Sequence, residues 1–273
     1  MSRRPGQRGR PSSSRKGGGR RSTPRNRPGL GGEQVEGRRA VRELLLAGRR
    51  TVREIVLAQD LDPAPLLDDI RQLATEQRVP LREVGRSKLD DLAVTSAPQG
   101  VVARAAPLPE VDLERLADGA GGVPFLLAVD GITDPQNLGA VLRTADGAGV
   151  TGVVLPRHRN ARVTPAVTKA AAGAIEYLPI ATVPGIPAAL QALSGHGVWC
   201  VGLEADASTS VHDLRVATDP IVLVLGGEGR GLSRLVRERC DVLAAVPLRG
   251  SLDSLNVSVA AGVACYAIDR QRH

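Results

Sequence analysis

Residues 222–232, VLVLGGEGRGL, constrain the fold of this chain more than any other stretch. An apolar run over 221–225 ends in a glycine cluster at 226–231, and a helix is expected over 232–239. Open α/β sheets bind ligands just beyond the carboxyl ends of their strands, and glycines let a ligand lie against the main chain. The pattern predicts a buried strand that opens into a site, although tight packing alone also produces such corners.

The glycine cluster is not a common nucleotide loop. The dinucleotide pattern G-x-G-x-x-G would need glycine at Leu232, and the chain contains no G-x-x-x-x-G-K-[ST] phosphate loop. These departures count against a Rossmann-type oxidoreductase, which an NAD titration would test.

Strands and helices are expected to alternate regularly over residues 123–273. A parallel sheet covered on both faces follows from this order, so we predict an α/β fold. The expected strands are 125–130, 152–155, 177–180, 198–203, 221–225 and 242–246, and the expected helices are 137–148, 164–172, 186–194, 232–239 and 255–270.

A smaller α/β unit is predicted over residues 33–105, followed by a linker at 106–122. Its arginines Arg38, Arg39, Arg49 and Arg50 are expected on the surface, where they either meet phosphates or are simply solvated. Its expected helices are 35–47, 64–77 and 87–92, and its expected strands are 52–58, 80–84 and 100–105.

The positive charge of the chain is concentrated in its first 32 residues. This tail holds ten Lys and Arg and no acid, which leaves 26 basic against 29 acidic residues elsewhere. With almost nothing apolar to bury, the tail is expected to be disordered. A cationic block of this kind binds polyphosphate independently of nucleotide sequence. The alternative is a solubilising extension. Contact with RNA is favoured over it only because the folded part, through the resemblance given below, also points to RNA.

Composition narrows the function classes further. Four aromatic residues leave little for stacking RNA bases, and no apolar run reaches the length of a membrane span. Cys200, Cys240 and Cys265 are far apart in apolar surroundings and are expected to be reduced. Without Cys or His at ligand spacing, we expect no metal site, and the protein is expected to be cytoplasmic.

Three segments of the larger unit are polar where packing does not require it. The first contains Asn137 and Arg143, which lie about 120° apart on one helix. The second is the glycine corner with Glu228, and the third is the loop 247–258 with Ser254 and Asn256. Each residue alone has a structural explanation as a helix cap, a turn residue or a surface ion pair.

Together these segments resemble the three motifs of the SpoU/TrmH family of RNA 2′-O-ribose methyltransferases, within the SPOUT class. The resemblance rests on DPQNLGAVLRTADGAGV, VLVLGGEGRGL and VPLRGSLDSLNVSVAAGVA, in order across roughly 124–270. The front unit, which starts with VEGRRAVRELL, is similar to the L30e-like RNA-binding domain that precedes the catalytic domain in family members acting on guanosine in 23S rRNA.

The resemblance implies a deep trefoil knot, a homodimer with its active site at the interface, and S-adenosylmethionine as methyl donor. It implies catalytic roles for Asn137, Arg143, Glu228, Ser254 and Asn256. It also implies cofactor contacts from Gly226, Gly227, Val246, Pro247, Leu248 and Leu255. Because a guanidinium stays protonated, we do not expect Arg143 to accept the hydroxyl proton. We expect it to bind the adjacent phosphate and to stabilise the negative charge that develops on the alkoxide.

The expected reaction is methylation of a ribose 2′-hydroxyl, with a guanosine of 23S rRNA as the leading substrate. Another rRNA nucleotide, as in antibiotic resistance, and tRNA remain alternatives. A non-enzymatic RNA-binding protein is the rival outside this class. Such a protein would not need Asn137, Arg143 and the glycine corner together.

Overall fold

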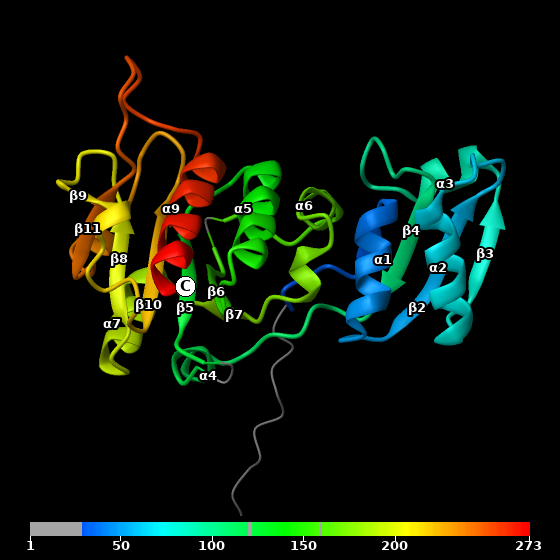
Figure 1. Ribbon diagram of the computed structural model, residues 1–273. Coiled ribbons are helices and arrows are strands. Elements are labelled where there is room, and N and C mark those ends of the chain that lie inside the picture. Colours follow the sequence, from blue (N-terminus) through cyan, green and yellow to red (C-terminus); the bar gives the residue numbers. More distant parts are fainter. Residues whose placement is uncertain (1–28, 120–121, 159) are drawn as a thin grey trace, which may run out of the picture.

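The computed structural model describes residues 29–119, 122–158 and 160–273, arranged as two units with separate sheets (Figure 1). The four-stranded sheet has the order β1-β4-β2-β3, and the seven-stranded sheet has the order β7-β6-β5-β10-β8-β11-β9. Most of the predicted basic tail, residues 1–28, lies outside the described part of the chain.

The front unit is a mixed sheet with helices. Strand β4 pairs antiparallel with β1 and β2, and β2 pairs parallel with β3. Its elements are β1 (Gln34–Glu36), α1 (Arg38–Ala47), β2 (Val52–Ala58), α2 (Pro65–Glu76), β3 (Leu81–Val84), α3 (Arg86–Leu92) and β4 (Val101–Ala105).

The larger unit has an entirely parallel sheet among the described strands, which confirms the predicted α/β class. Parallel strands end at the same edge, so the segments that follow β5, β10, β8 and β11 meet there. Its elements are α4 (Leu113–Ala117), β5 (Phe125–Asp130), α5 (Pro135–Gly147), β6 (Gly152–Pro156), α6 (Pro165–Ala170), the 3₁₀ helix η1 (Ala174–Glu176), β7 (Ile180–Val183), α7 (Ile186–Gly195), β8 (Trp199–Leu203), β9 (Thr209–Ser210), the 3₁₀ helix η2 (Val211–Asp213), β10 (Ile221–Gly226), α8 (Arg234–Arg237), β11 (Val242–Ala245) and α9 (Val257–Arg272).

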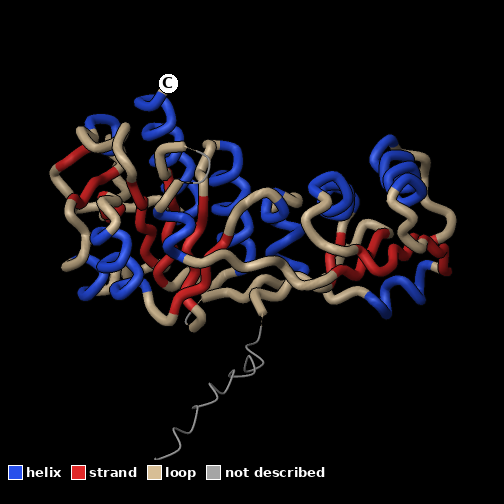
Figure 2. Tube along the Cα trace, turned by 90° about the horizontal axis from the view of Figure 1, so that it is seen from below, coloured by secondary structure: helices blue, strands red, loops and turns tan. Residues whose placement is uncertain are grey.

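Helices cover both faces of this sheet (Figure 2). Helices α5 and α9 pack on one face, where Leu127 and Val141 belong to one aliphatic core. Helices α7 and α8 pack on the other face, where Leu126 and Leu190 belong to a second core. Strands buried on both sides need continuous apolar runs, which explains why the run at 221–225 does not alternate with polar residues.

Several expectations about local structure were wrong. Residues 34–36 form a strand rather than the start of α1, because Gly37 with φ 96° turns the chain before the helix. The strand expected at 177–180 begins only at Ile180, after η1. Arg50 is buried, with its residue 8% exposed, because it forms an ion pair described below.

Every helix in the described residues is too short or too polar to cross a membrane. The three cysteines are free, as expected. Burial raises the pKa of the Cys200, Cys240 and Cys265 thiols to about 12, so they remain protonated at neutral pH.

Candidate active site

The glycine corner after β10 is built by close approach of backbone segments. A β-carbon at Gly226 would collide with the main chain of Gly231 and Leu232, and one at Gly227 would lie 2.5 Å from the Gly131 carbonyl oxygen. The Gly231 N–H donates to the Gly227 carbonyl at 3.1 Å and closes the turn. Glycine is therefore required here by packing, whatever ligand lies nearby.

Two carboxylates that the sequence reasoning missed hold this corner. Glu204 accepts a hydrogen bond from the Leu232 N–H at 2.8 Å, and Asp130 accepts one from the Ser233 N–H at 3.2 Å. Both residues stand at the carboxyl ends of the two strands that flank β10. Their position in the alternating strand pattern is the signal that would have found them.

Asn137 joins the three polar segments that the sequence singled out. Its Nδ2 donates to Oε1 of Glu228 in the glycine corner, and its Oδ1 accepts from Nδ2 of Asn256 at 3.1 Å. Asn137 is not the cap of α5, because Asp134 takes that position and accepts from the Gln136 N–H at 3.1 Å. An amide in the first turn is thus free to connect the three segments.

Asn256 has a structural role as well as a place in this network. It is the N-cap of α9, and its Oδ1 accepts from the N–H and the hydroxyl of Ser258 at 2.9 and 2.6 Å. The cap fixes the Asn256 side chain with its Nδ2 directed at Asn137. The capping and site interpretations of this residue are therefore compatible.

Arg143 and Ser254 lie outside the network. Arg143 is exposed on α5 about 9 Å along the helix axis from Asn137. Ser254 is exposed, and its hydroxyl donates to the neighbouring Asp253 at 3.3 Å. Within the described part of the chain, neither side chain hydrogen-bonds to Asn137 or Glu228. Both stay accessible to a ligand.

A cavity of about 380 Å³ opens beside β11. Three of the expected cofactor contacts, Val246, Pro247 and Leu248, line it together with Ala205, residues 207–210, Ala245 and Asp253. The other three do not line it. Leu255 is in the exposed loop before α9. Gly226 ends β10 and Gly227 follows it, and β10 is two strands from β11, so both glycines are about 10 Å away.

The lining of this cavity fits an adenosyl ligand. Its volume lies within the roughly 300–1,000 Å³ usual for cofactor sites. Ala205, Val246 and Leu248 offer apolar surface, while the hydroxyls of Ser208 and Thr209 offer hydrogen bonds to a ribose or an amine. Sequence reasoning missed Ala205 and residues 207–210, which follow β8 at the sheet edge where ligands bind.

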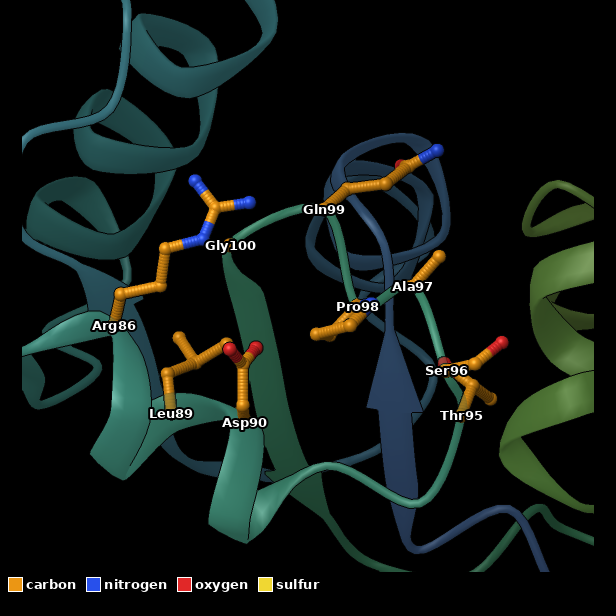
Figure 3. A pocket seen from close by; sticks show the side chains of 9 residues that line it. All are labelled: Arg86, Leu89, Asp90, Thr95, Ser96, Ala97, Pro98, Gln99 and Gly100. Carbon is orange, nitrogen blue, oxygen red and sulfur yellow. The ribbon is translucent and has the colours of Figure 1, made fainter.

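A second cavity, of about 490 Å³, is far from this chemistry. It lies in the front unit between α3 and the loop 93–100, where Arg86, Asp90 and Gln99 line it (Figure 3). The described residues contain no group of three or more His, Cys, Asp or Glu that could hold a metal ion.

Comparison with known proteins decides the family. The profile described as "SpoU rRNA Methylase family" matches residues 124–266, and "RNA 2'-O ribose methyltransferase substrate binding" matches residues 34–111. The first covers more than half of the chain and includes Asn137, Glu228 and Asn256.

The chain belongs to the SpoU rRNA Methylase family.

Curated relatives of this SpoU protein carry a more specific name. It is 44% identical over 211 residues to the 23S rRNA (guanosine-2'-O-)-methyltransferase RlmB of Pseudomonas aeruginosa, covering 76% of this chain and 84% of the relative. It is 40% identical over 243 residues to the RlmB of Pseudomonas syringae pv. tomato, covering 88% and 96%.

Solved structures share the arrangement of both units. The SpoU methyltransferase AviRb from Streptomyces viridochromogenes, in complex with AdoMet, aligns with a TM-score of 0.72 and 26% identity. The alignment covers 88% of this chain and 90% of AviRb. The SpoU family assignment therefore extends to the order and packing of the elements that position Asn137.

Proposed function

We propose that this SpoU protein transfers a methyl group from S-adenosylmethionine to the ribose 2′-hydroxyl of a guanosine in 23S rRNA. The observation that carries the proposal is the hydrogen-bonded set Asn137, Glu228 and Asn256, gathered from three segments at one sheet edge. The relatives named RlmB at 40–44% identity support the choice of RNA.

S-adenosylmethionine, when bound, supplies a methyl group already activated on a positively charged sulfur. The protein therefore has to orient the 2′-hydroxyl and exclude water, and good alignment contributes up to about 7–11 kcal/mol. Val246, Pro247 and Leu248 would hold the donor in the cavity beside β11. The backbone at Gly226 and Gly227, which does not line this cavity, would contact the part of the donor that extends beyond it. No metal is needed for this chemistry.

Asn137 is proposed to place the target ribose. Its side chain is fixed at both ends, by Glu228 and by Asn256, so its orientation is set before RNA binds. Ser254 and Leu255, in the exposed loop before α9, would close on the substrate and the donor.

Arg143 is proposed to hold the adjacent phosphate. Its guanidinium is exposed about one and two-thirds turns from Asn137 and presents a fork that matches phosphate oxygens. The same positive charge would stabilise the alkoxide that develops at the 2′-oxygen, while the proton leaves to phosphate or water.

The finer architecture belongs to the proposal as well. We infer a trefoil knot around 221–257, supported by the path of the chain from β11 back to α9, which packs against α5 on the same face of the sheet. The units 33–105 and 123–273 would act as an L30e-like RNA-binding domain and a catalytic domain, joined by the linker 106–122.

A homodimer is proposed because apolar side chains stand exposed on α9 and on the loop before it. Val259 and Tyr266 on α9 are 51% and 52% exposed, and Leu252 in the preceding loop is 79% exposed. Covering them with a second copy would bury apolar surface and shield the site from water. Action on ribosomal RNA would place the enzyme in the cytoplasm.

The decisive experiment maps 2′-O-methyl groups in rRNA from cells with and without the protein, and from cells carrying Asn137→Ala. A single guanosine in 23S rRNA that loses its methyl group in both altered strains is the expected result. Loss of a methyl group from another rRNA nucleotide or from tRNA would instead identify that nucleotide as the substrate. Unchanged methylation throughout would overturn the proposed activity.

A further inference from the structure

Arg50 connects the two units through a buried forked ion pair. Its Nε and Nη2 donate to the two carboxylate oxygens of Glu176 at 2.9 and 2.5 Å, and its Nη1 donates to the carbonyls of Gly32 and Ala106 at 2.7 Å each. The side chains of Arg50 and Glu176 are 2% and 1% exposed. The chain enters the front unit at Gly32 and leaves it at Ala106. One guanidinium therefore contacts both ends of the front unit and, through Glu176, the larger unit.

Further contacts surround this pair. Arg49 donates to the carbonyls of Glu176 and Leu178 at 2.9 and 3.2 Å, and the Tyr177 hydroxyl donates to Glu43 on α1 at 2.8 Å. Lys169 on α6 donates to the carbonyl of Ala97. The last contact ties α6 to the loop that lines the front cavity, and Figure 3 shows a helix of the larger unit passing beside that loop.

The elements on the far side of this junction continue to the proposed catalytic helix. Helix α6 and η1, which carry Lys169 and Glu176, pack against α5. Gly139 on α5 allows this approach, since a β-carbon there would lie 2.8 Å from the Val167 carbonyl oxygen. The front unit is thus connected, through the packed elements α6 and η1, to helix α5, which bears Asn137 and Arg143.

An ion pair of this kind specifies geometry more than it adds stability. Replacing a buried pair with apolar residues of similar volume is often neutral for stability. A guanidinium with four fixed acceptors, in contrast, satisfies its hydrogen bonds in only one relative orientation of the two units. Apolar contact alone tolerates sliding and rotation.

We propose that Arg50 is a positioning residue, which through Glu176 holds the front unit in one orientation relative to Asn137 and Arg143. RNA bound by the front unit then meets the catalytic helix at a preset distance. The kinetic part of this inference rests on the proposed function, while the orientation itself does not.

The test uses the full chain with spin labels at Glu76→Cys on α2 and Gln191→Cys on α7, in a Cys240→Ser background. The key variant combines Arg50→Met with Glu176→Met, which keeps the buried volume and leaves no unpaired charge. Arg50→Lys keeps the charge without the fork. Arg71→Met, which removes an exposed ion pair with Glu83 in the front unit, is the matched control.

We expect a narrow label-to-label distance distribution in the parent and in Arg71→Met, a broad one in the double variant, and an intermediate one in Arg50→Lys. KM for 23S rRNA is expected to rise at least tenfold in the double variant, with kcat and S-adenosylmethionine affinity changing less than twofold.

Distance distributions that stay equally narrow in the double variant would overturn the proposal, and so would an unchanged KM beside a broad distribution. If the parent protein itself fails to methylate rRNA, the proposed function falls. The distance measurement still decides whether Arg50 sets the orientation.

Discussion

Asn137 and Glu228 are joined side chain to side chain although 91 positions separate them in the chain. Asn256 completes the set from a third segment, 119 positions from Asn137. Donor and acceptor have fixed identities here, because Asn137 donates to a carboxylate and accepts from an amide. This directionality makes the network testable by exchanging the roles of its members.

Asn137→Asp is expected to lower methyl transfer by about 100-fold or more, because it replaces the donor with a carboxylate that faces Glu228. Adding Glu228→Gln supplies a donor at the opposite side and removes the repulsion, so the double variant should recover a tenfold or larger part of the loss. Turnover assays on 23S rRNA measure both. Strictly additive losses would argue against a functional Asn137–Glu228 contact.

Arg143→Ala is expected to lower kcat/KM for RNA by at least 100-fold and to leave S-adenosylmethionine affinity unchanged. The reason is that its exposed guanidinium serves phosphate and developing charge, not the cavity beside β11. For Arg143→Lys we expect a kcat/KM between those of Arg143→Ala and the parent, because lysine keeps the positive charge and loses the forked guanidinium. Arg234→Ala, at an 85% exposed side chain on α8, is the control, and turnover of Arg143→Ala equal to that control would remove Arg143 from the mechanism.

Gly227→Ala is expected to destabilise the fold by about 1–3 kcal/mol, because the added carbon would press on the Gly131 carbonyl. It should also weaken S-adenosylmethionine binding by moving the corner. Gly250→Ala, at a glycine with open space around it, should change stability by less than about 0.5 kcal/mol. Urea unfolding compares the stabilities of the two variants, and calorimetry compares their S-adenosylmethionine affinities. Equal stabilities would mean that the corner accommodates the added carbon without cost.

Glu36 gives the front unit a pH-dependent stability. Burial alone would raise the pKa of this carboxyl. The hydrogen bonds from Thr95, from the Val94 and Thr95 N–H groups and from Gln34 outweigh burial and hold the pKa below its ordinary value. A lowered pKa in the folded state means that the carboxylate stabilises above the ordinary value of 4.5, and that this stabilisation is lost as pH falls through the folded-state pKa.

Glu36→Gln should therefore cost about 1–3 kcal/mol at pH 7 and progressively less below about pH 4. Urea unfolding of variant and parent, at pH 7 and again below about pH 4, measures the difference in their free energies of unfolding. Glu83→Gln, in an exposed ion pair of the same unit, should cost under about 1 kcal/mol at pH 7. A Glu36→Gln penalty that grows on acidification would contradict the assignment.

Apolar patterning alone predicted much of the fold. The strands over 52–58 and 125–130 begin and end where the sequence places them, because each contains a short apolar run, over 55–58 and 125–129, next to polar residues. The helix expected over 232–239 is shortened to Arg234–Arg237, and β9 was missed, since two residues give no periodicity.

The candidate site was predictable because its residues are polar where packing does not require it, and because their three segments together resemble the motifs of the family. Asn137, Glu228 and Asn256 were chosen from sequence and lie together, while their chemical roles stay predictions. The burial of Arg50 was not predictable, because arginine is usually exposed and its partner Glu176 lies 126 positions away. Glu204 and the loop 205–210 were missed because neither carries a distinctive motif.

The sheet order has a consequence for synthesis on the ribosome. Phe125 at the start of β5 pairs with Ile221 at the start of β10, and no described strand made earlier occupies that side of β5. At common translation rates the intervening residues take roughly 5–20 s to emerge. During that interval the nascent chain exposes an open, aliphatic strand edge, which makes this the moment when chaperones or a neighbouring polysome chain have most opportunity to bind it.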